Sequence, residues 1–296
     1  MNIGIIMFLP HLTLNCGGKL LYLKEPVVMG ILNLTPDSFF EASQLEADES
    51  LVEKAGRMLE SGAAILDVGG ISTRPGAQEI TAAEELKRVL PAIILLKKNY
   101  PDALISVDTY RSLVAREAVT AGAIMINDIS AGEMDEGFLE TVAGLNVPYV
   151  LMHMQGRPQT MQKNPFYNDV LLEVTDFFIQ KIGRLRGLGV KDIILDPGFG
   201  FGKTVEHNYR LLTGMHVFKM LEYPLLAGLS RKSMVTRLLD VPPENALNGT
   251  SVLNFIALQQ GAKILRVHDV KEATEVIKIF KMTEETKISE LRQINP

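Results

Sequence analysis

Cysteine is almost absent from this sequence: among 296 residues there is one, Cys16. A single thiol excludes an intrachain disulfide framework and any zinc or iron–sulfur site built from several cysteines. The five histidines also lack the close spacing that zinc ligands show. We therefore expect a protein of a reducing compartment, the cytoplasm, without a permanent zinc site.

A strong net charge and long apolar runs are absent as well. The formal charge of −5 offers no general attraction to nucleic acid or to an anionic membrane, so any site for an anion has to be built locally. No segment approaches the roughly 18 apolar residues of a membrane span, and the apolar run 3–10 has no basic residue before it, unlike a signal peptide. We expect small-molecule partners, an N-terminal extension over residues 1–13 and one domain over residues 14–296.

Short apolar, β-rich runs alternate along the chain with segments of helical periodicity such as 169–188. A strand that is apolar throughout is buried on both faces, which is typical of a parallel sheet covered by helices. Eight such units predict an α/β fold, a closed (β/α)8 TIM barrel, with an open doubly wound sheet as the alternative. A β-hairpin around Gly17 and Gly18 is expected to cover the bottom of the barrel. The eight predicted strands are 27–32, 64–66, 104–107, 124–126, 148–152, 192–195, 224–227 and 263–266.

Polar side chains follow all eight predicted strands. One polar residue after a strand carries little information, because loops are generally polar, but a full set is harder to dismiss. Barrel enzymes place their active site at the C-terminal ends of the strands. These ends carry Asn33, Asp67, Asp108, Asn127 with Asp128, His153, Asp196, residues 230–232, and Arg266 with His268.

Asp108, Asn127, Asp196 and Lys232 are expected to converge at this end of the barrel. A carboxylate can accept two parallel N–H bonds, while a lysine and an amide can hold the opposite edge of a ring. The set therefore predicts a site for a heterocycle that has adjacent N–H groups and a carbonyl. The alternative is structural: an Asp–Lys ion pair, with the carboxylates capping the turns that follow them.

Basic and hydroxyl residues follow three of the strands. They occur in segments 72–76 and 230–233 and at Arg266 and His268. Segment 230–233 opens a helical stretch, where free N–H groups favour an anion. Together these residues predict a positive rim in an acidic protein, and separate solvated charges are the alternative.

The segment 196–203 reads Asp-Pro-Gly-Phe-Gly-Phe-Gly-Lys. It is not a phosphate-binding Walker motif, because Pro197 stands where the first glycine is required and Asp196 would repel a triphosphate. A hydrolase serine elbow is excluded too, because Lys232 replaces its last glycine. We expect at least one of Phe199 and Phe201 to cover a planar substrate.

Several long motifs occur in the order found in one enzyme family. Residues 29–39 read Met-Gly-Ile-Leu-Asn-Leu-Thr-Pro-Asp-Ser-Phe, and 67–76 read Asp-Val-Gly-Gly-Ile-Ser-Thr-Arg-Pro-Gly. With segments 196–203, 230–233 and 266–269 they resemble the dihydropteroate synthases, folate-pathway transferases inhibited by sulfonamides. The resemblance implies that 6-hydroxymethyl-7,8-dihydropterin diphosphate is joined to p-aminobenzoate, giving 7,8-dihydropteroate and pyrophosphate.

The same resemblance implies roles for individual residues, a bound Mg2+ and a homodimer. C–O cleavage would release pyrophosphate before the arylamine attacks the resulting pterin cation. Asp108, Asp196, Lys232 and Arg74 would act in catalysis, and Asn33 would bind Mg2+. The implied binding residues are Asp108, Asn127, Met152, Asp196, Phe201, Gly228 and Lys232 for the pterin, Asn33, Arg74, Arg266 and His268 for the diphosphate, and Thr73, Pro75, Phe201, Lys232 and Ser233 for p-aminobenzoate.

The sequence departs from the family pattern at two places inside the domain. Ile71 stands where Gly-Gly-Glu-Ser-Thr-Arg has its Glu, and residues 40–43 read Phe-Glu-Ala-Ser where Ser-Asp-Gly-Gly is frequent. Two alternatives stay open: a pterin-binding methyltransferase domain and a non-catalytic pterin-binding paralogue. Residues 73–75 and 230–233 favour the synthase, because a methyltransferase has no diphosphate to expel.

Overall fold

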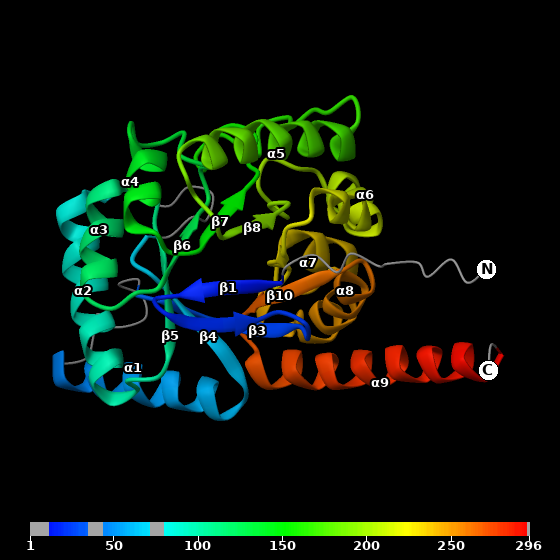
Figure 1. Ribbon diagram of the computed structural model, residues 1–296, viewed down its shortest axis with the longest axis horizontal. Coiled ribbons are helices and arrows are strands. Elements are labelled where there is room, and N and C mark those ends of the chain that lie inside the picture. The colour runs from blue at the N-terminus through cyan, green and yellow to red at the C-terminus, as the bar shows by residue number, and fades with distance from the viewer. Residues whose placement is uncertain (1–11, 35–43, 72–79, 295–296) are drawn as a thin grey trace, which may run out of the picture.

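Eight parallel strands close into a barrel surrounded by helices in the computed structural model of this chain (Figure 1). The structure describes residues 12–34, 44–71 and 80–294. The strand order β10-β3-β4-β5-β6-β7-β8-β9 confirms the predicted (β/α)8 barrel and excludes the open sheet. The strands are β3 (Val27–Asn33), β4 (Ala63–Gly69), β5 (Leu104–Asp108), β6 (Met125–Asp128), β7 (Tyr149–Met152), β8 (Ile193–Asp196), β9 (Leu225–Ala227) and β10 (Ala262–Val267).

The helices cover the outside of the barrel, as the amphipathic segments predicted. Segment 205–221 is divided, because α6 ends at Gly214 and a 3-10 helix, η2 (Met215–Leu221), continues from it. Helices α1 and α4, which were not predicted, also cover the barrel. The helices are α1 (Gln44–Glu60), α2 (Ala82–Asn99), α3 (Ser112–Thr120), α4 (Phe138–Leu145), α5 (Val170–Gly187), α6 (Val205–Gly214), α7 (Ser233–Leu239), α8 (Leu247–Gln259) and α9 (Val270–Ile294), with a 3-10 turn, η3 (Pro243–Asn245).

Side chains alternate along each strand between two apolar cores. Leu66, Val107 and Leu265 point outward into the layer between strands and helices. Ile65 and Ile264 point inward with residues of the other strands, and this second cluster fills the lower barrel. Because successive strand residues face opposite sides, the same alternation decides which residues reach the barrel mouth.

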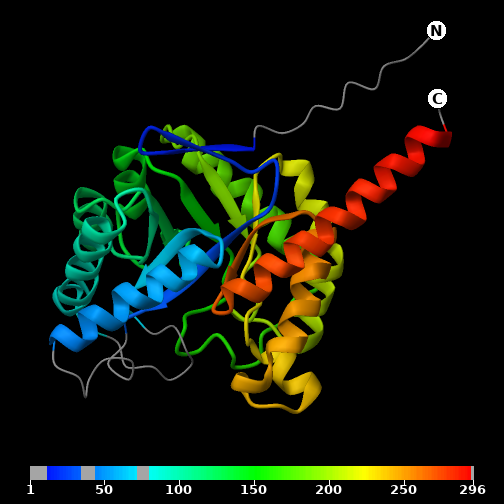
Figure 2. The same ribbon diagram turned by 90° about the horizontal axis from the view of Figure 1, so that it is seen from below.

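The predicted hairpin is present and covers the end of the barrel at which the strands begin; it is the dark-blue segment along the top of Figure 2. Strands β1 (Thr13–Cys16) and β2 (Lys19–Tyr22) pair antiparallel across Gly17 and Gly18, both at positive φ, as a tight two-residue turn requires. Leu14, Cys16 and Leu23 are buried against the inner core, which confirms the predicted cap. Residues 1–11 lie outside the described residues, so the division between residues 13 and 14 stays a prediction.

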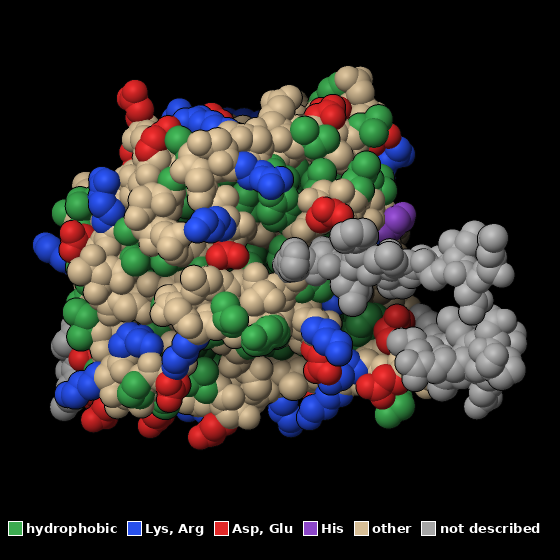
Figure 3. All heavy atoms as spheres, in the orientation of Figure 1, with side chains coloured by type: hydrophobic (Ala, Val, Ile, Leu, Met, Phe, Trp, Pro, Cys, Tyr) green, Lys and Arg blue, Asp and Glu red, His purple; other side chains and the backbone are tan. Residues whose placement is uncertain are grey.

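No helix within the described ranges is long and apolar enough to cross a membrane. On the face shown in Figure 3, Lys and Arg side chains are interspersed with Asp and Glu. That face therefore has no large patch of one charge, in agreement with the balanced composition. A functional cluster of charged residues is therefore expected at the strand ends rather than on this face.

Candidate active site at the barrel mouth

The barrel interior changes from apolar to polar within two residues along four strands. Since residues two apart on a strand face the same side, the polar residue lies directly above an apolar one. The polar side chains therefore sit on the inner core, at the C-terminal end of the barrel. The pairs are Ile65 and Asp67 on β4, Met125 and Asn127 on β6, Ile194 and Asp196 on β8, and Ile264 and Arg266 on β10.

Strand register places the end residues of four neighbouring strands at one level. Asn33 is paired with Gly69, Gly69 with Asp108, and Asp108 with Asn127. Gly69 leaves room for this arrangement, because a Cβ there would lie 3.3 Å from the Cβ of Asp108. The predicted convergence of Asp108 and Asn127 is thus produced by the register of β4, β5 and β6.

Arg266 binds two carboxylates at the centre of the mouth. Its Nε donates to Oδ2 of Asp67 and its Nη2 donates to Oδ2 of Asp108, each over 2.6 Å. Nδ2 of Asn127 donates to the same Asp67 oxygen over 3.0 Å. Asp67 therefore fixes both the guanidinium and the amide, and it turns the amide oxygen of Asn127 away from itself. Asp67 is one of the polar residues at the strand ends, but it was not assigned to the site from the sequence. Its position two residues after Ile65, which faces the barrel interior, could have indicated that it points into the mouth.

Burial and charge act in opposite directions on these groups. Burial raises the pKa of Asp108 to about 7, and Arg266 opposes the rise. Burial also raises the pKa of Asp196, against the charge of Lys232 and the hydrogen bond from Gly198. For Arg266, burial disfavours the charged form, but Asp67 and Asp108 more than compensate and raise its pKa. The mouth therefore holds acidic groups whose charge a ligand with N–H donors would stabilise.

Lys232 lies on the opposite side, against the glycine-rich loop that follows β8. Its Nζ donates to the carbonyl of Phe199 over 2.5 Å and lies 4.9 Å from the ring centroid of Phe201. A Cβ on Gly228 would lie 3.6 Å from this Nζ and 4.0 Å from Cβ of Arg266, so Gly228 sits between the two cations. Burial lowers the pKa of Lys232 to about 8, while Asp196 opposes the decrease.

The alternative of a purely structural role, with an Asp–Lys ion pair and carboxylates that cap turns, is met only in part. Oδ1 of Asp196 accepts a hydrogen bond from Gly198 N over 2.8 Å, so this carboxylate does cap its turn. The salt bridges found among the described side chains include none between Lys232 and an aspartate, and Asp108 pairs with arginine instead. Capping uses one oxygen of Asp196, and the alternative therefore does not exclude a binding role.

An apolar cluster forms one wall of the mouth. Tyr110, Ile129 and Met152 are buried together, and Phe201 packs against them from the glycine-rich loop. Ile71, which stands where the family has Glu, packs on the same cluster. The substitution thus extends an apolar wall next to Met152 and Phe201.

Only some of the basic residues of the predicted positive rim are available to bind an anion. Arg231 makes two hydrogen bonds to the Asp269 carboxylate, of 3.0 and 2.6 Å, so its charge is already paired. Nδ1 of His268 lies 3.1 Å from the hydroxyl of Ser230, which orients the ring. Burial and the charge of Arg266 lower the pKa of His268 to about 4, so the imidazole is neutral at pH 7. Ser233 is the first residue of α7.

Asp128 turns away from the site. It accepts hydrogen bonds from the backbone of Ser130 and Gly132 and from the hydroxyl of Tyr149, over 2.7, 2.7 and 2.8 Å. These contacts hold the loop after β6. Asp128 is therefore a structural residue, although it directly follows Asn127 in the sequence.

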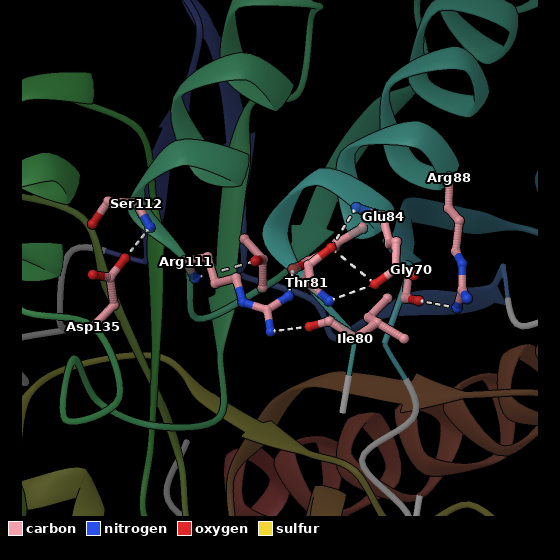
Figure 4. Close-up of polar contacts among 10 residues, drawn as sticks. Gly70, Ile80, Thr81, Glu84, Arg88, Arg111, Ser112 and Asp135 are labelled. Carbon is pink, nitrogen blue, oxygen red and sulfur yellow. Dashed lines mark hydrogen bonds and ion pairs between the residues drawn. The ribbon is translucent and has the colours of Figure 1, made fainter. Parts of the chain in front are cut away.

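Thr73, Arg74 and Pro75 lie outside the described residues, as do residues 40–43. The residues on either side of segment 72–79 are anchored (Figure 4). Nη1 of Arg88 donates to the carbonyl of Gly70 over 3.0 Å, and Arg111 donates to the carbonyl of Ile80. The next residue, Thr81, begins α2 with a reciprocal pair of hydrogen bonds to Glu84, a capping box.

One side chain at the mouth could hold a divalent cation that is brought by a phosphate ligand. Within the described ranges there is no group of three or more His, Cys, Asp or Glu side chains that could hold a metal alone. Asn33, a partly exposed residue at the end of β3, has an amide oxygen that could serve. Mg2+ usually keeps several waters and binds through few protein oxygens together with substrate phosphates, so a single oxygen donor fits it.

Comparison with known proteins agrees with this geometry. A sequence model of the family described as pterin binding enzyme matches residues 29–268. Dihydropteroate synthase from Escherichia coli (strain K12) is 46% identical over 268 residues, covering 90% of this chain and 94% of its own. A crystal structure of the Yersinia pestis dihydropteroate synthase with a sulfonamide drug superposes with a TM-score of 0.86 at 44% identity, covering 92% of this chain and 99% of its own.

A third relative was solved with one of the expected substrates. The Xanthomonas albilineans dihydropteroate synthase with 4-aminobenzoic acid superposes with a TM-score of 0.85 at 40% identity, covering 93% of this chain and 98% of its own. The fold, the mouth and the matched family model define a pterin-binding enzyme. Within that family, the chain belongs to the dihydropteroate synthases, transferases of folate biosynthesis.

Proposed function

We propose that the barrel mouth condenses 6-hydroxymethyl-7,8-dihydropterin diphosphate with p-aminobenzoate, and that the residues described above divide this work among three subsites. The network of Asp67, Arg266, Asp108 and Asn127, facing Lys232, carries the proposal. The network offers hydrogen-bond acceptors on one side and a cation on the other. A pterin ring is complementary to this arrangement, because it has adjacent N–H donors on one edge and a carbonyl acceptor on another. Membership of the family supplies the reaction.

The pterin is proposed to bind between Asn127, Asp108 and Asp196 on one side and Lys232 on the other. Asn127 presents its oxygen because its Nδ2 is engaged by Asp67. A carboxylate can then accept adjacent N–H groups of the ring, and Lys232 can donate to its carbonyl. Met152 and Phe201 supply an apolar wall for the ring face, and Gly228 leaves room between the cations.

The diphosphate is assigned to Asn33, Arg74, Arg266 and His268. A guanidinium has five N–H donors, and the contacts found among the described residues use Nε and Nη2 of Arg266, which leaves further donors for an anion. Neutral His268 can still donate one N–H. Asn33 would hold Mg2+, and the bound ion would supply charge neutralisation for the departing pyrophosphate.

The second substrate, p-aminobenzoate, is assigned to Thr73, Pro75, Phe201, Lys232 and Ser233. Phe201 touches the apolar cluster and lies beside Lys232, so the glycine-rich loop borders both substrates. We propose that Lys232 and Ser233, at the start of α7, receive the carboxylate. The complex of the X. albilineans enzyme with 4-aminobenzoic acid supports this choice of substrate.

Catalysis is proposed to depend on charge stabilisation rather than on a strong base. Cleavage of the C–O bond transfers the electron pair to pyrophosphate and leaves a positive charge delocalised into the pterin. Ionised Asp108 and Asp196 stabilise that charge, while Lys232 and Arg74 contribute to the binding of the anionic groups. The arylamine then forms the C–N bond and loses a proton.

An initial-rate assay tests this proposal. The protein is incubated with the pterin diphosphate, p-aminobenzoate and Mg2+, and both pyrophosphate and dihydropteroate are measured, with each component omitted in turn. We expect both products only in the complete mixture. Pterin binding with neither product would favour the non-catalytic paralogue, and methyl transfer from a methylated folate without pyrophosphate would favour the methyltransferase.

Three wider properties are proposed with this function. The single cysteine and the small-molecule substrates support a cytoplasmic location. Sulfonamide inhibition is supported by the sulfonamide complex of the Y. pestis relative. A homodimer is supported by exposed apolar side chains on α7, α8 and α9, and sedimentation at micromolar concentration would test it. Those side chains include Leu239, Val252 and Ile279.

A further inference from the structure

Lys203 ends the glycine-rich loop, and its ammonium group is turned into the protein. The residue is only 3% exposed. Its Nζ lies 2.9 Å from Nδ1 of His153 and 3.3 Å from the carbonyl of His153. It also donates to the carbonyls of Gly198 and Phe201, each over 3.0 Å. An ammonium has three N–H donors, so these four acceptors use all of its donors.

The loop backbone packs directly on the segment that follows β7. Gly198 and Gly202 have φ of +69° and +61°, and a Cβ would lie 1.8 Å from the carbonyl oxygen of His153 and 2.3 Å from that of Gln155. Only glycine fits such a close approach of two backbones. The approach leaves carbonyl oxygens of both segments facing inward, and Lys203 occupies the point where they meet.

The ring of His153 completes this arrangement as an acceptor. It packs edge-on against Phe177 with centroids 4.8 Å apart, and lies 6.1 Å from the Tyr167 ring. Burial and the charge of Lys203 lower the pKa of His153 to about 2, so the ring is neutral. Burial lowers the pKa of Lys203 to about 7, while Asp196 favours its charged form. A neutral imidazole and three carbonyls thus surround this ammonium group with acceptors.

The other side of the same loop faces Lys232, which is assigned above to both substrates. The carbonyl of Phe199 accepts from Lys232, and the ring of Phe201 lies beside that ammonium. Lys203 and Lys232 therefore hold this loop from opposite sides. Lys203 makes its contacts on the inner side, through the carbonyls of Gly198 and Phe201.

We propose that Lys203 is a positioning residue for p-aminobenzoate: by holding the carbonyls of Gly198 and Phe201, it places the Phe201 ring and the carbonyl that anchors Lys232. The inference rests on the proposed function, because the loop is assigned there to the second substrate. It also explains why the lysine of a motif resembling a phosphate loop is not available to phosphate. The pterin edge formed by Asp108 and Asn127 makes none of these contacts.

The test compares Lys203→Met with Lys263→Met. Methionine keeps the length of the chain without its donors, and Lys263 is a matched control whose Nζ donates to one carbonyl, that of Lys24, at the other end of the barrel. With saturating pterin diphosphate, we expect Lys203→Met to raise the KM for p-aminobenzoate about tenfold or more, the scale expected when buried carbonyls lose a charged donor. The affinity for the pterin measured by calorimetry should fall by less, because Phe201 and Lys232 also border the pterin but Asp108 and Asn127 make none of these contacts. Lys263→Met should match the parent in both measurements.

A double-mutant cycle separates positioning from a general loss of structure. If Lys203 acts through Phe201, adding Lys203→Met to Phe201→Ala should raise KM by far less than Lys203→Met does alone. Independent, additive effects would overturn the proposal, as would an unchanged KM in a folded Lys203→Met protein. If that variant does not fold, His153→Phe removes one acceptor and keeps a ring beside Phe177; it should raise the same KM, and an unchanged KM would again overturn the proposal. An inactive parent protein would instead contradict the proposed function.

Discussion

Replacing Asp67 by asparagine tests the network that orders the pterin edge. The variant keeps the size of the side chain and one oxygen that can accept from Arg266 and Asn127, but it removes the negative charge. A hydrogen bond to a charged group contributes about 1.5–3 kcal/mol, and the variant moves this contact from the upper to the lower end of that range, because only the guanidinium is still ionised. Losing about 1.5 kcal/mol at the 2.6 Å bond to Nε of Arg266 corresponds to about a tenfold loss of pterin affinity.

Calorimetry with the pterin diphosphate, together with initial rates, measures this effect. The matched control is Asp128→Asn, since Asp128 is also a buried carboxylate at the barrel mouth but contacts only loop backbone and Tyr149 among its described partners. We expect Asp128→Asn to lower the melting temperature and leave pterin affinity within about twofold. The reasoning would be refuted if Asp67→Asn bound the pterin like the parent, or if both variants weakened binding equally.

Three further outcomes are expected. Lys232→Ala and Asp196→Ala should each abolish most activity while circular dichroism shows a folded barrel; parent-like kinetics in either would contradict its assignment. The kcat/KM for the pterin diphosphate should rise as pH increases through about 7, where Asp108 ionises, and fall above about 8, where Lys232 loses its proton; a pH–rate profile without these limbs would argue against both roles. Arg111→Met should lower the free energy of unfolding by about 3 kcal/mol at pH 8, because buried Glu85 loses the partner 2.8 Å away. The loss should be smaller at pH 5, because burial raises the pKa of Glu85 and favours its protonated form; equal losses in urea unfolding at the two pH values would oppose this explanation.

The barrel could be predicted from the sequence because its strands are apolar on both faces and its strand ends are polar. Both features can be recognised from neighbouring residues in the sequence, without knowing which distant residues they contact. Helix α4 could not be found in the same way, because it has only 8 residues. It begins after Gly137 and ends before Asn146, both at positive φ, and those conformations are set by the surrounding fold.

The residues of the site could be predicted, but their contacts could not. Asp67 and Arg266 are separated by 199 positions, and they meet only because β10 closes the barrel beside β3. The inward direction of Lys203 depends on the close backbone approach at Gly198, which the letters of a glycine-rich motif do not specify. Ile71 illustrates the opposite case: the sequence shows the loss of a carboxylate, and the structure adds that the side chain extends the apolar wall.

The most direct test of the account is a single-turnover experiment with enzyme in excess over the pterin diphosphate, in the presence of p-aminobenzoate and Mg2+. Pyrophosphate and dihydropteroate are quantified in the same quenched samples. The account predicts that both accumulate to one equivalent of the pterin supplied, and that Asp196→Ala slows both. Stable pterin binding with neither product in the parent protein would contradict it.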